Sequence, residues 1–256
     1  MKRTELKQKL AARETTIGSW ITLPHPAIAE IMVNAGFEWI VVDLEHSAIT
    51  IGEAIELIRT IELSGAAPLV RLTSNDANQI KRVMDGGAHG VIVPMLNSED
   101  EARRAVDAVY YPPRGTRGVG LSRAQAYGDG FSDYRTWLDD EAVVIAQIEH
   151  IEGVRNLEQI LSVEGIDGYI IGPYDLSASL GAPGDFESSA FISAMARIEE
   201  VGRAMKKSGG VHIVEPDPDI LARRLTEGFN FIAYSVDIRM LDRACRAVSH
   251  IVKGVQ

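Results

Sequence analysis

Three ionisable side chains, Asp43, Glu45 and His46, follow directly after the apolar run at 39–42. Such a short run, rich in β-branched residues, is typical of a buried parallel strand. In parallel α/β folds the carboxyl ends of the strands meet at a shared mouth, where catalytic side chains lie. The sequence therefore predicts acid–base chemistry at this strand end. The residues alone equally allow a helix cap at Asp43 and an ordinary loop histidine at His46.

Charged residues end three further predicted strands, namely Arg71, Glu149 and Asp175. Glu149 and Asp175 supply only oxygen ligands, which suits Mg²⁺ or Mn²⁺ better than zinc, and such a pair discriminates weakly between these ions and Co²⁺. We therefore predict a divalent-metal site at 149 and 175, with coordination positions left for water and a chelating substrate. The alternative is that each acid simply begins or caps a helix.

The elements that must position these residues repeat eight times as a short Val/Ile-rich run followed by a stretch of helical periodicity. This alternation predicts parallel strands joined by helices, which close into a (β/α)8 TIM barrel spanning 1–256 as a single domain. A doubly wound open sheet is disfavoured because no glycine fingerprint follows the first strand. The predicted strands lie at 17–23, 39–43, 67–71, 90–94, 142–148, 168–171, 210–214 and 229–234.

Two segments interrupt the repeat. The segment 110–134 is rich in Gly, Pro, Arg and aromatic residues, and a loop of this length in a compact domain is usually functional. We expect it to cover the mouth of the barrel, where Arg123 and Tyr127 would contact a bound ligand. The second is a turn-prone stretch at 181–187, which leads into a long helical pattern over 188–207.

Composition narrows the classes of function. The 256 residues carry 26 basic and 36 acidic side chains, and the net charge of -10 disfavours binding to nucleic acid. No apolar run approaches the roughly 18 residues that a membrane span needs, so we expect a cytoplasmic protein without a membrane partner. The single cysteine, Cys245, excludes an intrachain disulfide, and its helical context predicts a buried position.

Five motifs carry the chemistry-bearing residues: Asp43-Leu44-Glu45-His46, Val70-Arg71, the segment 114–120, Gln147-Ile148-Glu149, and the segment from Gly172 to Ser177. In order and spacing they resemble the class II pyruvate aldolases of the HpcH/HpaI family, over nearly the whole chain. The resemblance implies a barrel of the phosphoenolpyruvate/pyruvate-binding type, assembled as a homo-oligomer, usually a hexamer with exchanged helices. It also implies reversible cleavage of a 4-hydroxy-2-oxo acid into pyruvate and an aldehyde.

The resemblance assigns roles to the strand-end residues. Pyruvate would chelate a divalent metal held by Glu149 and Asp175, and Arg71 would hold the enolate oxygen. His46, oriented by Asp43, would carry the proton of the C4 hydroxyl, for which a near-neutral imidazole is suited.

For other site residues the sequence leaves more than one role open. Gln147 would hydrogen-bond pyruvate, although a buried structural glutamine fits equally well. Tyr174 departs from the small residue of many relatives, and its ring would narrow the mouth beside Asp175. The segment 211–216 also departs from the family pattern, and we expect His212 within it to be structural. Both departures leave the identity of the aldehyde open.

Two other classes of function remain beside a metal-dependent aldolase. One is an acyl-CoA lyase of the citrate lyase β-subunit or malyl-CoA type, which would need a basic groove for coenzyme A that an acidic chain does not indicate. The other is a non-catalytic binding barrel. A Schiff-base aldolase is disfavoured, because every lysine lies in the N-terminal stretch or on a predicted helix.

Overall fold

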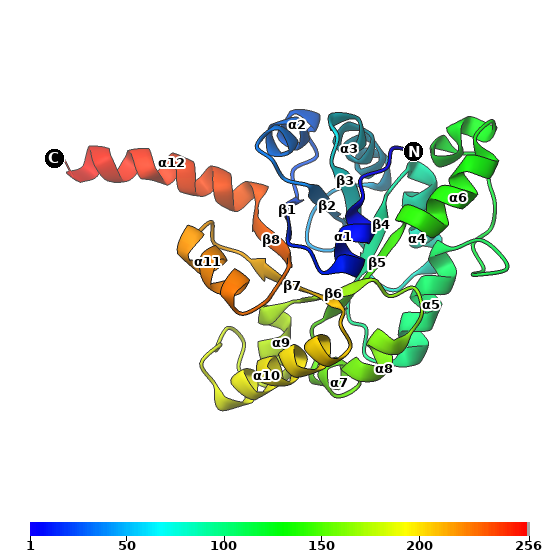
Figure 1. The fold of residues 1–256 in the computed structure, drawn as a ribbon. Helices are drawn as coiled ribbons and strands as arrows, with labels where there is room; N and C mark the ends of the chain where they lie inside the picture. The colour runs from blue at the N-terminus through cyan, green and yellow to red at the C-terminus, as the bar shows by residue number, and fades with distance from the viewer. Residues whose placement is uncertain (255–256) are drawn as a thin grey trace.

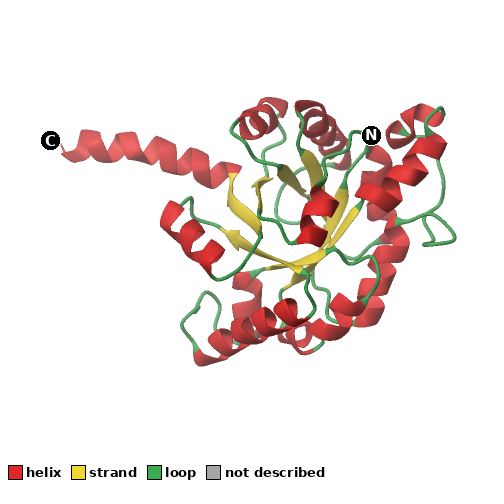
Figure 2. Ribbon diagram, viewed as in Figure 1, coloured by secondary structure: helices red, strands yellow, loops and turns green. Residues whose placement is uncertain are grey.

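The computed structural model describes residues 1–254, with side chains described through Val248. Eight parallel strands form a closed barrel in the order β1 to β8 (Figures 1 and 2), which confirms the predicted fold. Their bounds lie within about two residues of those predicted for most strands. The strands are β1 Thr16–Ile21, β2 Trp39–Asp43, β3 Ala67–Arg71, β4 Gly90–Val93, β5 Val143–Ile148, β6 Gly168–Ile171, β7 Ser208–Ile213 and β8 Phe231–Val236.

Helices surround the barrel, and three of the described ones, α1, η1 and α6, were not predicted. The helical stretch between β5 and β6 is two short helices, α7 and α8, with a break at Asn156. The helices are α1 Leu6–Ala12, α2 Pro26–Asn34, α3 Ile51–Ser64, α4 Ala77–Gly86, α5 Glu99–Val109, η1 Arg123–Gly128, α6 Phe131–Glu141, α7 Ile151–Arg155, α8 Leu157–Ser162, α9 Pro173–Ser179, α10 Ser189–Ala204, α11 Pro218–Thr226 and α12 Asp237–Gly254.

The alternation of side chains along the strands decides which residues face the barrel interior. Trp39 and Val41 belong to an interior cluster, while Ile40 and Val42 pack against the surrounding helices. Because the period is two, the last residue of β2, Asp43, also faces the interior. The same counting places four more polar or aromatic side chains in the upper interior, namely Trp20, Arg71, Gln147 and His212.

The lower end of the barrel is closed by packing. Leu6 and Leu10 of α1 are buried in the interior cluster. Trp39 stacks on Phe231 with ring centroids 4.1 Å apart. A Cβ at Gly18 would lie 2.0 Å from the Trp39 ring, so only glycine fits there. The interior is therefore filled at the bottom, and the polar groups that line a pocket lie at the top.

The segment 110–134 does not cover the mouth of its own barrel, contrary to the sequence-based prediction. Arg123 donates to the Gly86 carbonyl at the C-terminal end of α4 (3.2 Å) and to Glu62 near the C-terminal end of α3. Both helix ends lead into strands, so they lie at the bottom of the barrel. The topology requires this placement, since the segment follows a helix and precedes β5.

The last helix, α12, extends away from the barrel (Figure 1). Cys245 lies on it and is exposed, so the prediction of a buried cysteine was wrong. Helical periodicity identified the helix but could not show that its described side chains, among them Leu241 and Val248, are exposed. None of the described helices is both long and apolar enough to cross a membrane.

Glu62 joins several segments at the bottom of the barrel. Its buried carboxylate accepts from the Lys2 N–H (2.8 Å) and from Arg123, and His89 Nε2 lies 3.7 Å away. Burial alone raises the pKa of Glu62, but these three polar neighbours outweigh burial and lower the pKa to about 2. The ionised carboxylate therefore stabilises the fold at neutral pH.

We expect Glu62→Gln to lower the free energy of unfolding by about 2–3 kcal/mol at pH 7. Because the folded-state pKa lies below the unfolded value, this stabilisation is complete above pH 4.5 and is lost as the pH falls towards 2. Urea unfolding of both proteins between pH 7 and the lowest pH that preserves the fold measures the difference. Glu56→Gln, an exposed position on the same helix, is the control and should change stability by less than about 0.5 kcal/mol. A Glu62→Gln loss that stayed constant with pH would contradict the assignment.

Candidate functional site

The ends of β2 and β3 hold an ion pair, Asp43 with Arg71, whose Cα positions are paired in the sheet register. Arg71 Nε donates to Asp43 Oδ1 (2.9 Å) and Arg71 Nη2 donates to Oδ2 (2.6 Å). Burial alone raises the pKa of Asp43, but Arg71 outweighs burial and holds the pKa below its usual value. The guanidinium also lies 4.4 Å from the Trp20 ring. Arg71 is thus fixed on two sides and keeps outer N–H groups for a ligand.

Asp43 does not orient the His46 ring, so that sequence-based prediction is wrong for this structure. The Asp43 carboxylate is taken by Arg71 and by the backbone N–H groups of Glu45 (3.0 Å) and His46 (3.3 Å). The His46 ring is 64 % exposed, and its Nε2 lies 3.9 Å from Glu45 Oε2. His46 therefore lies at the rim, outside the set of residues that line the pocket.

Glu149 follows β5 directly and is buried. Its Oε2 accepts from the Met95 N–H (3.1 Å), and its Oε1 accepts from Gln147 Nε2. Met95 adopts the left-handed φ of 54°, rare for a residue with a side chain, and thereby turns its N–H towards the carboxylate. Gly172 leaves the room that Glu149 needs, since a Cβ there would lie 2.6 Å from Oε1.

Like charges surround Glu149. Burial raises its pKa to about 7, and the carboxylates of Glu45 and Asp175 add to this effect, against the opposing hydrogen bonds from Met95 and Gln147. Burial also raises the pKa of Glu45, whose Oε2 lies 3.3 Å from Arg71 Nη1. The site thus holds more negative charge than Arg71 balances.

The predicted ligand pair fits a divalent cation. The carboxylates of Glu45 and Asp175 raise the pKa of the buried Glu149, so a cation would stabilise this cluster, and oxygen ligands suit hard ions. Across the residues that the structure describes, no group of three His, Cys, Asp or Glu side chains is arranged to hold a metal. A cation here would therefore depend on Glu149 and Asp175, with its other ligands from water or substrate.

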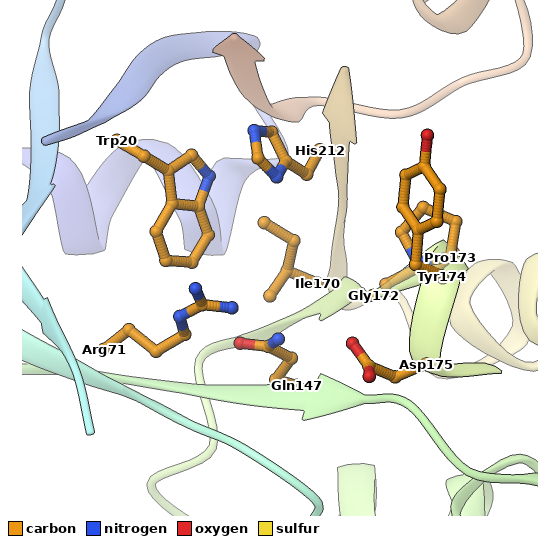
Figure 3. Close-up of a pocket in the computed structure, with 10 residues that line it drawn as sticks. Trp20, Arg71, Gln147, Ile170, Gly172, Pro173, Tyr174, Asp175 and His212 are labelled. Carbon is orange, nitrogen blue, oxygen red and sulfur yellow. The ribbon is translucent and has the colours of Figure 1, made fainter. Parts of the chain in front are cut away.

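A small pocket lies above these groups (Figure 3). Arg71, Gln147 and Asp175 line one side, and Tyr174 stands at its edge. Two residues not predicted for the site, Trp20 and His212, form the opposite wall. His212, expected to be structural, faces the pocket. The sequence signal was available, since both residues occupy interior positions at the ends of β1 and β7.

Comparisons with known proteins identify the family of this chain. Residues 16–244 match the model of the HpcH/HpaI aldolase/citrate lyase family. The chain is 36 % identical to a hydroxypyruvate/pyruvate aldolase of Sagittula stellata, over 96 % of each chain. It is 38 % identical to a 4-hydroxy-2-oxo-heptane-1,7-dioate aldolase of Shigella sonnei, over 95 % of this chain and 92 % of the relative.

A solved structure gives the same result. An HpcH/HpaI aldolase/citrate lyase family protein from Burkholderia cenocepacia superposes with a TM-score of 0.91 at 30 % identity, covering 98 % of this chain and 99 % of the other. Sequence, fold and strand-end residues therefore lead to one assignment. This chain belongs to the HpcH/HpaI aldolase/citrate lyase family.

Proposed function

We propose that this protein is a metal-dependent pyruvate aldolase that reversibly cleaves a 4-hydroxy-2-oxo acid into pyruvate and an aldehyde. The observation that carries the proposal is the buried Glu149, set among the like charges of Glu45 and Asp175. The family and the names of its relatives support the reaction class. None of the eight strands carries a lysine, so covalent imine chemistry has no nucleophile in the barrel wall.

The cation would be Mg²⁺ or Mn²⁺, with Co²⁺ as a third candidate, held by Glu149 and Asp175. When bound, it would supply a Lewis acid for the keto oxygen of the substrate. Arg71, locked by Asp43, would donate to the same oxygen as negative charge develops on it. Gln147 would orient the substrate through its side-chain Oε1, which is buried without a partner among the described residues and would accept from the C4 hydroxyl.

His46 would carry the proton in this proposal, although its ring lies at the rim of the pocket. In the cleavage direction the ring would take the proton of the C4 hydroxyl, directly or through water. The C3–C4 bond then breaks, the aldehyde leaves, and the electron pair moves into the enolate whose oxygen Arg71 holds. His46 would then return that proton, directly or through water, to C3, which yields pyruvate. The exposed ring is free to turn towards the bound substrate, because neither of its nitrogens is tied to Asp43.

We also propose a homo-oligomer, with a hexamer as the expected assembly, in the cytoplasm. The support is α12, which leaves the barrel and exposes apolar side chains, including Ile238 (45 % exposed), Leu241 (56 %) and Val248 (63 %). An isolated helix with an exposed apolar face is stabilised by packing against another surface.

The first test of the reaction is loss of the pyruvate methyl protons in D₂O, followed by proton NMR. With Mg²⁺ or Mn²⁺ we expect catalysed exchange, because enolate formation needs no aldehyde. EDTA should abolish the exchange, and Glu149→Ala should slow it at least about 100-fold while weakening Mn²⁺ binding in calorimetry. Glu152→Ala, an exposed position on the neighbouring helix, is the control. Full exchange in EDTA would disprove metal dependence.

A second test concerns Arg71. Arg71→Lys keeps the positive charge but loses the two parallel hydrogen bonds to Asp43, so the donor is no longer held in place. We expect kcat for pyruvate release from 4-hydroxy-2-oxoheptanedioate to fall about 100-fold or more. Arg59→Lys, exposed on α3, should behave as the parent. An Arg71→Lys enzyme with unchanged kcat would remove Arg71 from the mechanism.

The assembly is tested by light scattering after size exclusion. We expect a particle six times the 27.9 kDa chain mass. Leu241→Asp together with Val248→Asp should shift it to smaller species, because charge on the apolar face of α12 opposes packing. A parent protein that runs as a monomer would refute this part of the proposal.

A further inference from the structure

Trp20 presents an unusual donor to the pocket. The residue is 3 % exposed, and its indole Nε1–H has no hydrogen-bond partner among the residues that the structure describes. Buried indole N–H groups normally have a partner, so each exception needs a physical reason. The ring itself is held in place by Arg71 on one side and His212 on the other.

His212 presents the matching acceptor. Its Nε2 lies 3.1 Å from the Ser235 carbonyl oxygen, and because a carbonyl only accepts, Nε2 must carry the hydrogen. Burial lowers the pKa of His212 to about 4, and the Arg71 charge acts in the same direction against the opposing Ser235 contact. The ring is therefore neutral at pH 7, which leaves Nδ1 as an acceptor.

The backbone of β8 supports this tautomer. Ser235 adopts a left-handed φ of 57°, and the pairing of β1 with β8 shifts register between Gly18 and Trp20. The Ser235 carbonyl accepts from Ser19 Oγ (3.2 Å) as well as from His212. A strained non-glycine residue beside a pocket indicates a functional constraint, here the fixed orientation of the imidazole.

The donor and the acceptor lie together. The two rings have centroids 5.3 Å apart with an angle of 36° between their planes. In Figure 3 they form one wall of the pocket, with one ring nitrogen of His212 turned towards Ile170, opposite Gln147 and Asp175. An alcohol hydroxyl both donates and accepts a hydrogen bond, so one hydroxyl can satisfy both groups.

We propose that Trp20 Nε1 and His212 Nδ1 form a subsite for an alcohol hydroxyl on the carbon next to the reacting carbonyl of a substrate. This inference rests on the proposed function, since it takes the oxo acid to lie on Arg71 and Asp175. The cavity volume is about 60 Å³, and a water-sized group needs about 10–15 Å³, so the pocket suits compact substrates. The hydroxyl belongs either to a 3-hydroxy-2-oxo acid or to a 2-hydroxyaldehyde.

Three variants separate the two hydrogen bonds. His212→Asn keeps an acceptor where Nδ1 stood but cannot reach Ser235, whereas His212→Gln keeps the donor to Ser235 and loses the acceptor towards the pocket. Trp20→Phe removes only the indole N–H from the wall. Tyr174→Phe removes a hydroxyl at the opposite edge of the pocket and is the control.

The measurement is the ratio of kcat/KM for a hydroxylated substrate to that for its counterpart without the hydroxyl, with Mg²⁺ present. One arm compares hydroxypyruvate with pyruvate, both adding to acetaldehyde. The other compares glycolaldehyde with acetaldehyde, both with pyruvate. Because each ratio is taken on one variant, a general loss of activity cancels.

We expect a ratio of about 10 or more in one arm for the parent protein, since a hydrogen bond of ordinary strength gives about this discrimination. That arm identifies which substrate carries the hydroxyl. His212→Asn and Tyr174→Phe should keep the ratio, and His212→Gln and Trp20→Phe should bring it towards one.

Two outcomes overturn the subsite. A parent ratio near one in both arms would show that water, not a substrate hydroxyl, satisfies the pair, and this result needs no variant to fold. A high ratio unchanged in His212→Gln and Trp20→Phe would place the recognition elsewhere. Failure of the proposed function is distinguished by the pyruvate exchange assay, because a protein without metal-dependent exchange or cleavage has no ratio to measure.

Discussion

An excess of negative charge at the barrel mouth is the constraint on which the site depends. Asp43 and Arg71 neutralise each other, and Glu45, Glu149 and Asp175 remain. Burial and repulsion from Glu45 and Asp175 raise the pKa of Glu149 to about 7. Holding this group beside its neighbours therefore destabilises the fold. A divalent cation, held as proposed by Glu149 and Asp175, would convert that repulsion into binding energy.

Packing below the site fixes the strands and offsets this destabilisation. The lower interior is filled by the stacked rings of Trp39 and Phe231 and by Leu6 and Leu10 of α1. Each strand end therefore holds its side chain at a defined height. Strained backbone conformations then orient two polar groups at the site. Met95 turns an N–H onto Glu149, and Ser235 turns a carbonyl onto His212, both through a left-handed backbone. Residues this strained persist only where the surrounding structure over-determines them.

Much of the fold followed from the sequence, since period-two and helical patterns repeated eight times and left one plausible closure. The residues Arg71, Gln147 and Asp175 were predicted because they stand at strand ends, and the pocket brings them together. The partner of Asp43 was mispredicted. Asp43 lies beside Arg71 because of the register in which β2 pairs with β3, and the sequence of neither strand alone determines that register.

Two other placements that the sequence analysis did not foresee follow from the direction of the chain and the alternation of side chains along a strand. Segments after a helix return to the bottom of a barrel, so 110–134 could not reach its own mouth however functional its composition looked. Conversely, His212 looked structural by residue type, yet counting in twos from Gly210 along β7 turns it inwards at the top. Whether a side chain can belong to the site of a barrel therefore depends first on its place in the alternation along the strand and on the direction of the chain. Its chemistry comes second.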